Sequence, residues 1–189
     1  MTRRKTAKDF DPQNADMEVI AQDVARTMNP NLEQIRGPSN DAGDDGLFRD
    51  TKTGRLLTVE SKFVRQQNNI SKGAVVNLDE AGARNGEMYG AESDGLLVTT
   101  SGDTGRGAKQ AVRQAASEGR KIEIVGFTQL QNIARNPETD PDLAQRIEAA
   151  LKKKARRVTS QNGDVLNGSR VITPTPRSLV AATSGQTLL

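Results

Sequence analysis

The sequence Gly37-Pro-Ser-Asn-Asp-Ala-Gly-Asp-Asp-Gly-Leu-Phe48 is followed, after a short polar segment, by Leu56-Leu-Thr-Val-Glu-Ser-Lys-Phe63. The intervening Thr51-Lys-Thr-Gly-Arg55 is typical of a hairpin turn, because Gly54 readily adopts the positive φ that such turns require. Aliphatic and β-branched residues on both sides of the turn predict two strands. We therefore expect an antiparallel hairpin whose open end carries acidic residues from both segments.

Three charged residues define the chemistry expected at this open end. Asp45 opens the first strand and Glu60 ends the second, so pairing of the strands brings the two carboxylates together. Lys62 projects from the same face as Glu60, about two rises of ~3.3 Å along the strand. Two carboxylates, with water and a substrate phosphate, suit Mg²⁺, which polarises phosphorus and activates water. Lys62 would orient or help deprotonate that water, or neutralise charge on the phosphoryl oxygens.

Further segments follow in a defined order. They are Met17-Glu18, Gly43-Asp44-Asp45-Gly46, Val59-Glu60-Ser61-Lys62, Gly95-Leu-Leu-Val-Thr-Thr100, Ala108-Lys-Gln-Ala111 and Lys121-Ile-Glu-Ile-Val-Gly126. In this order, residues from about 16 to 134 resemble the PD-(D/E)xK nuclease superfamily. The resemblance is closest to the Mrr-like branch of type IV restriction endonucleases and their Holliday-junction resolvase relatives.

The resemblance implies a fold, an activity and a set of site residues. The fold is a restriction-endonuclease-like α/β core, with a mixed central β-sheet flanked by helices. The activity is that of an endodeoxyribonuclease, with Mg²⁺ as cofactor and Mn²⁺ as a substitute. Asp45, Glu60 and the Ser61 carbonyl would bind the metal, and Lys62 would serve the attacking water. The substrate would be double-stranded or branched DNA, and a homodimer is expected because cutting both strands needs two sites.

Several assignments remain open at this stage. Either Asp44 or Asp45 is the metal ligand, and Asp45 is favoured because it adjoins the apolar strand. Glu18 either points into the metal site or complements the positive N-terminus of its helix, and the second interpretation is slightly favoured. A Glu-x-Lys pair on a solvated strand also occurs by chance. Phe63-Val64-Arg65 departs from the family, which has an aromatic residue after the catalytic Lys-Arg.

Periodicity and turn residues predict the remaining elements. These are a helix from Asp16, as its N-cap, to Asn29-Pro30, an edge strand over 32–36, a helix over 71–84, a buried central strand over 96–100, a helix capped by Asp103 or Thr104 that ends near Gly119, a strand over 122–125, a helix stopping at Asn136-Pro137 and a helix opened by Asp140-Pro141 with Leu143, Ile147, Ala150 and Leu151 on one face. Strand, helix, strand at this spacing predicts parallel pairing of 96–100 with 122–125.

The last predicted helix runs into Lys152-Lys-Lys-Ala-Arg-Arg157. Its five cations, Lys152, Lys153, Lys154, Arg156 and Arg157, are candidates for contacts with the DNA backbone; a solvated helix end is the alternative. Composition divides the chain into a flexible basic arm over 1–12, a nuclease-like domain over 13–157 and a disordered polar tail over 158–189.

Composition excludes several classes of site. The 189 residues include no Cys and no His, which rules out disulfides, Cys or His zinc sites and mechanisms that need a His base or Cys nucleophile. Gly102 to Lys109 lacks the spacing of a nucleotide-binding phosphate loop. No long apolar run predicts a membrane segment, so a cytoplasmic location is expected.

Charge and aromatic content bear on the partner. The 27 Lys and Arg residues exceed the 24 Asp and Glu by three, too few to prove nucleic-acid binding. The absence of Trp and the single Tyr favour contacts with a duplex backbone over base stacking. Two alternative functions remain: a non-catalytic DNA-binding or structural protein, for example of a phage or mobile element, and a nuclease toxin acting on RNA.

Overall fold

The computed structural model describes residues 14–37, 44–64, 69–102 and 104–152. Its centre is a five-stranded mixed sheet in the order β1-β2-β3-β4-β5. The strands are β1 (Leu32–Arg36), β2 (Gly46–Asp50), β3 (Leu56–Lys62), β4 (Ser93–Thr99) and β5 (Ile122–Val125). The first three strands pair antiparallel, and β3, β4 and β5 are parallel. The predicted hairpin, edge strand and parallel crossover are confirmed.

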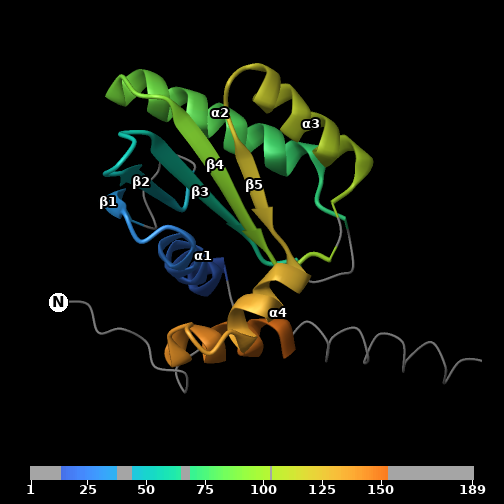
Figure 1. Ribbon diagram of the computed structural model, residues 1–189. Helices are drawn as coiled ribbons and strands as arrows, with labels where there is room; N and C mark the ends of the chain where they lie inside the picture. The colour runs from blue at the N-terminus through green and yellow to red at the C-terminus, as the bar shows by residue number, and fades with distance from the viewer. Residues whose placement is uncertain (1–13, 38–43, 65–68, 103, 153–189) are drawn as a thin grey trace, which may run out of the picture.

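Helices cover both faces of this sheet, as expected for a mixed α/β core (Figure 1). On one face lies α1 (Asn14–Met28), and α2 (Lys72–Tyr89) and α3 (Arg106–Ser117) lie on the other. The chain then forms α4 (Phe127–Arg135) and a further helix over residues 141–152. The predicted fold class, a mixed sheet flanked by helices, is therefore confirmed.

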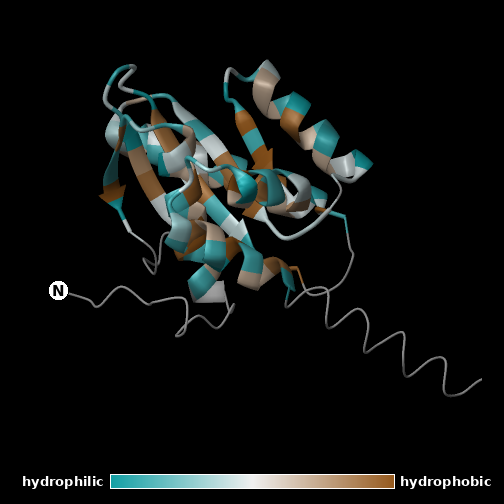
Figure 2. Ribbon diagram, turned by 60° about the horizontal axis from the view of Figure 1, so that its bottom comes forward, coloured by the Kyte–Doolittle hydropathy of each residue, from teal (hydrophilic) through white to brown (hydrophobic). Residues whose placement is uncertain are grey.

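Two hydrophobic clusters hold these layers together. The first joins α1 to the sheet and to the helix over 141–152, with Met17, Ile20, Val59 and Leu143 at its centre. The second joins α2 and α3 to the opposite face through Val75, Leu78, Leu97, Ala108, Ala111, Ala115 and others. Figure 2 shows hydrophobic segments within the strands, and Leu96, Leu97 and Val98 of β4 are buried, as expected for a strand covered on both faces.

The local signals behind two elements are clear in the structure. Gly54 has a φ of +74°, which permits the tight β2–β3 turn that aligns Gly46 with Val59. At the helix over 141–152, the Asp140 carboxylate accepts hydrogen bonds from the backbone N–H groups of Asp142 (2.9 Å) and Leu143 (3.0 Å). The predicted opening of this helix and its buried face, Leu143, Ile147, Ala150 and Leu151, are confirmed.

Three helix boundaries differ from the predictions. The first helix begins at Asn14, so Asp16 is a buried residue of its first turn and not the N-cap. The second continues beyond residue 84 to Tyr89 and ends at Gly90, whose φ of +62° suits a helix C-terminus. The third has Gly105 as its N-cap, not Thr104, and Asp103 lies outside the described residues. The predictions placed a side-chain cap at Asp16 and at Asp103 or Thr104. They were wrong for Asp16 and Thr104 because the first residue of a helix depends on tertiary packing as well as on the local sequence.

Part of the predicted organisation cannot be compared with the structure. The arm over 1–12, the tail over 158–189 and the cations Lys153, Lys154, Arg156 and Arg157 lie outside the described residues. Within the part of the chain that is described, no helix has the length and apolar character needed to span a membrane.

Candidate active site

The candidate site lies at the open end of the β2–β3 hairpin. The register pairs Gly46 with Val59, and its continuation sets Asp45 opposite Glu60. The Asp45 N–H donates to the Val59 carbonyl at 2.9 Å, which extends the pairing by one step beyond β2. Because directly opposed residues share a face, the two carboxylates project from the same side of the sheet. The hairpin thus brings together the residues that sequence reasoning paired.

Asp45 is held in place by contacts on both its side chain and its backbone. Its Oδ2 accepts a hydrogen bond from the Ser61 N–H at 2.5 Å, and its carbonyl accepts one from Gln22 Nε2 at 2.6 Å. Gly46 leaves room for that second contact, because a Cβ there would lie 3.2 Å from Gln22 Cγ. The backbone of Asp45 is therefore held in place, and its carboxylate lies at the open end of the hairpin.

Glu60 and Lys62 form an ion pair at the end of β3. Lys62 Nζ lies 2.7 Å from Glu60 Oε1, with the glutamate side chain 13% exposed and the lysine 47% exposed. Burial raises the pKa of Glu60 above its ordinary 4.5, Lys62 opposes that rise, and the charges of Asp45 and Asp44 add to it. Burial of the Glu60 carboxylate is therefore the main cause of its raised pKa.

Asp44 has a different environment from its neighbour. Its side chain, 1% exposed, forms an ion pair with Arg36 and accepts a hydrogen bond from Asn85 Nδ2 at 2.9 Å. Asn85 also donates to Thr58 Oγ1 at 3.0 Å and accepts from Arg36 at 3.0 Å. Since Asp44 is enclosed in this polar network between β1, β3 and α2, the geometry favours Asp45 as the carboxylate available to a ligand.

Glu18 approaches the site from α1. It is the fifth residue of the helix, and Asp16 is the acidic residue in the first turn. Burial raises the pKa of Glu18 above 4.5, and the charges of Asp45 and Glu60 raise it further. The Glu18 carboxylate therefore lies within electrostatic range of Asp45 and Glu60, and its role in the metal site stays a prediction.

The donor set fits a hard divalent cation bound largely by water. Within the described residues, no group of three or more acidic side chains is gathered so as to hold a metal ion. Asp45 and Glu60 offer two carboxylates. Ser61 lies between Glu60 and Lys62 in the sequence, and its N–H donates to Asp45. Mg²⁺ is commonly held by one or two carboxylates with water and substrate oxygens at its remaining positions. Glu18 contributes negative charge from nearby.

Sequence reasoning missed three polar residues that support the site. Gln22 follows Glu18 by four positions on α1, so helical spacing places both on one face, and this signal was readable. Asn85 follows Leu78 by seven positions and Ala81 by four, which marks a polar residue on the buried face of α2. Arg36 carries no such local signal, because its pairing with Asp44 depends on the antiparallel packing of β1 against β2.

Lys152 is the one cation of the basic run that the structure describes. Lys152 is exposed and forms an ion pair with Glu148 at 2.8 Å, four positions earlier on the same helix. This contact is typical of a solvated helix surface. The prediction that Lys152 contacts DNA stays a prediction, as does that for the four cations beyond it.

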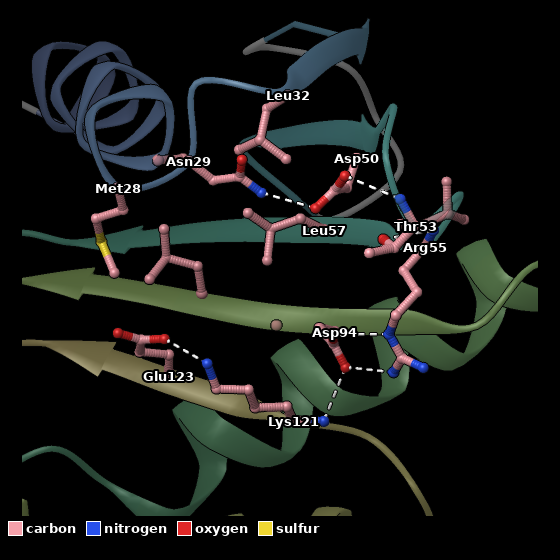
Figure 3. A pocket seen from close by; sticks show the side chains of 14 residues that line it. Met28, Asn29, Leu32, Asp50, Thr53, Arg55, Leu57, Asp94, Lys121 and Glu123 are labelled. Carbon is pink, nitrogen blue, oxygen red and sulfur yellow. Dashed lines mark hydrogen bonds and ion pairs between the residues drawn. The ribbon is translucent and has the colours of Figure 1, made fainter.

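A pocket of about 390 Å³ opens at the other end of the strands (Figure 3). Its polar side chains are paired with one another: Arg55 with Asp94 at 2.7 Å, Lys121 with Glu123 at 2.9 Å, and Asn29 with Asp50 at 2.9 Å. Those charges are compensated within the pocket. The pocket therefore shows no unpaired group that would direct a ligand.

Comparison with known proteins found similar chains among solved structures. No protein-family model matches it, and no curated protein matches it. Among solved structures it is similar to a repair endonuclease from Pyrococcus abyssi, with 20% identity and a TM-score of 0.45 over 62% of this chain and 49% of that one. It is also similar to EndoMS in a complex with double-stranded DNA, with 20% identity and a TM-score of 0.44 over 67% and 47% of the two chains. A third is the MspJI restriction endonuclease in complex with a 27-mer oligonucleotide, with 14% identity and a TM-score of 0.47 over 84% and 33%. The chain spans less than half the length of each.

Proposed function

We propose that this protein is a Mg²⁺-dependent DNA endonuclease of the PD-(D/E)xK type, in its Mrr-like branch. The observation that carries the proposal is the juxtaposition of Asp45 and Glu60 on one face of the β2–β3 hairpin, with Lys62 Nζ 2.7 Å from Glu60. Two carboxylates and a lysine at the open end of the β2–β3 hairpin suit hydrolysis of a phosphodiester. The chain has no His or Cys, so hydrolytic mechanisms that need a His base or a Cys nucleophile are excluded.

The metal would be held by Asp45, Glu60 and the Ser61 carbonyl. Mg²⁺, or Mn²⁺ in its place, would supply Lewis-acid polarisation of the phosphoryl group and a more acidic water. Asp45 is suited to this role because its backbone is fixed by Val59 and Gln22. The raised pKa of Glu60 reflects mainly its burial, and a bound cation would stabilise its ionised form.

Lys62 would act on the reacting groups. Its ammonium contacts Glu60, and because the side chain is 47% exposed it remains accessible to a phosphate at the end of β3. In that position it would orient the attacking water and stabilise the negative charge that develops on the phosphoryl oxygens. Asp44 would have a supporting role, since Arg36 and Asn85 occupy its carboxylate.

The expected polymer is double-stranded or branched DNA, as the sequence resemblance implies. A homodimer would place two such sites so that both strands are cut. Both statements rest on the resemblance, because a metal site of this kind contacts a phosphodiester that DNA and RNA share.

Cleavage assays with matched variants test the proposal. Wild-type protein, Glu60→Gln and Asp45→Asn would be incubated with supercoiled plasmid, branched DNA and RNA, in Mg²⁺, Mn²⁺ or EDTA. The control is Glu87→Gln, the same chemical change at an exposed position of α2. We expect metal-dependent DNA cleavage by wild type and Glu87→Gln, and a loss of at least about 100-fold in the two site variants, the scale on which electrostatic catalytic groups act.

Metal binding gives a second readout that does not depend on turnover. Titration calorimetry with Mn²⁺ should detect binding to wild type and Glu87→Gln, and much weaker binding to Glu60→Gln. The proposal would be overturned by DNA cleavage that persists in EDTA or in Glu60→Gln. Intact DNA binding without cleavage of any substrate would also overturn it, in favour of a structural DNA-binding role.

A further inference from the structure

The exposed side of α3 carries cations and no acidic residue. Its sequence, Arg-Gly-Ala-Lys-Gln-Ala-Val-Arg-Gln-Ala-Ala-Ser, places Arg106, Lys109 and Arg113 at a spacing of three and four, which is one face of a helix. All three are exposed, whereas Ala108, Ala111 and Ala115 are buried. In Figure 2 this helix alternates between hydrophilic and hydrophobic segments along its length. We call Arg106, Lys109 and Arg113 the α3 stripe.

The stripe lacks the internal compensation found at other cations of this protein. Arg55, Arg120, Lys121 and Lys152 each form an ion pair with a nearby carboxylate. Within the described residues, none of the three stripe cations pairs with an acidic side chain. Neighbouring like charges on a helix repel one another, and cations near its N-terminus oppose the helix dipole. The arrangement is unfavourable for the helix alone, and an anionic partner would offset it.

The stripe begins at the same edge of the sheet as the candidate active site. Strands β3 and β4 are parallel, ending at Lys62 and Thr99, and α2 and α3 begin shortly after them. A β-bridge between Ile70 and Thr104 joins the two connecting segments. The Cβ built at Gly107 would lie 3.2 Å from Lys72 Cβ, so the first turns of α2 and α3 are in contact.

The exposed Lys72 therefore extends the positive surface toward Glu60. Glu60 shares its face of the sheet with its partner on β4, Leu97, which packs in one cluster with Val75 in the first turn of α2. A polyanion that reached Glu60 and Lys62 would thus pass the start of α2 before reaching α3. The stripe itself spans about 10.5 Å from Arg106 to Arg113 at 1.5 Å per residue, enough to contact successive phosphates of one strand.

We infer that the α3 stripe binds the phosphate backbone of duplex DNA beside the bond that is cut. This inference rests on the proposed function and assigns a surface to its substrate. A membrane partner is disfavoured because none of the exposed large hydrophobic residues, Val19, Met28 and Met88, lies on α3, and interfacial helices insert an apolar face. The stripe reads no base, so its contribution is independent of DNA sequence.

The test measures binding of the full chain to a fluorescein-labelled 30-base-pair duplex in EDTA, across 50–200 mM NaCl. The stripe variant carries Arg106→Gln, Lys109→Gln and Arg113→Gln, which keeps good helix formers at each position. The control variant carries Lys52→Gln, Arg84→Gln and Arg135→Gln, three exposed cations on the hairpin, on later α2 and at the end of α4. Both variants lose the same net charge.

Counterion release sets the expected result. If each stripe cation contacts one phosphate, the slope of log affinity against log salt falls by about 2.7, or about 0.9 per contact. The loss of wild-type affinity between 50 and 200 mM salt should then exceed that of the stripe variant by about 40-fold. The control variant should keep the wild-type slope, and the stripe variant should unfold at the wild-type temperature or above, since repulsion is relieved.

Outcomes for the two proposals are separate because binding is measured without metal. Equal slopes in the stripe and control variants would overturn this inference even if Mg²⁺-dependent cleavage is found. Loss of binding in the stripe variant, with no cleavage by wild type, would support the DNA-binding surface and overturn the nuclease. Binding to vesicles of phosphatidylserine and phosphatidylcholine with no binding to the duplex would overturn the nucleic-acid assignment.

Discussion

Replacement of Asn85 by leucine tests the polar network beneath the candidate site. Asn85 is 3% exposed in α2 and makes three side-chain hydrogen bonds, to Asp44, Thr58 and Arg36. Leucine is close in volume and fits a helix, so the change removes the hydrogen bonds with little change in packing. It leaves the buried Asp44 carboxylate with Arg36 as its remaining side-chain partner.

The expected cost follows from those contacts. Two of the lost hydrogen bonds involve charged groups and contribute about 1.5–3 kcal/mol each, and the bond to the Thr58 hydroxyl contributes about 1 kcal/mol. Thr58 keeps Ser93 at 3.1 Å, Asp44 keeps Arg36, and the buried leucine regains about 1–2 kcal/mol. We expect a net loss of about 3 kcal/mol in the free energy of unfolding, or about 10 °C in the unfolding midpoint.

Urea and thermal unfolding followed by circular dichroism measure this change. The matched control is Asn77→Leu, the same substitution at an exposed position of the same helix, which should alter stability by less than about 0.5 kcal/mol. An unfolding free energy for Asn85→Leu within about 1 kcal/mol of that control would refute the reasoning, because it would mean that the network contributes no net stability.

Three further predictions concern charge. Because the folded-state pKa of Glu60 lies above 4.5, ionisation of Glu60 lowers the free energy of unfolding as pH rises from 4.5 through that pKa. Glu60→Gln should therefore be more stable than wild type at pH 7. Unfolding measured across pH should show no such gain below pH 4.5. Mg²⁺ at 100 times its dissociation constant should raise the free energy of unfolding of wild type by about 2.7 kcal/mol, which is seen as a higher unfolding temperature. An equal rise in Asp45→Asn would contradict the assigned ligands. Arg120, in the connection between α3 and β5, contacts Asp79 of α2 at 2.7 and 2.9 Å, so Arg120→Gln should cost about 1 kcal/mol in urea unfolding. No loss would mean that solvent screening removes the contribution of the pair.

Sequence alone determined the elements whose signals are local. The turn at Gly54 and the flanking β-branched residues predicted the hairpin, and alternation along its second strand set Glu60 and Lys62 on one face. Apolar residues at helical spacing predicted the buried face of the helix over 141–152. These predictions succeeded because hydrogen bonding within a turn, a strand or a helix limits where each side chain can point.

Tertiary structure alone decided how distant residues are combined. Asp44 and Asp45 are adjacent and chemically identical, and they differ because Arg36 of β1 and Asn85 of α2 contact only the carboxylate of Asp44. Helices α2 and α3 begin at the same end of the sheet as the candidate site because β3 and β4 are parallel. Such contacts depend on packing between elements, and the free energy of that packing is shared across the core instead of being encoded in any one segment.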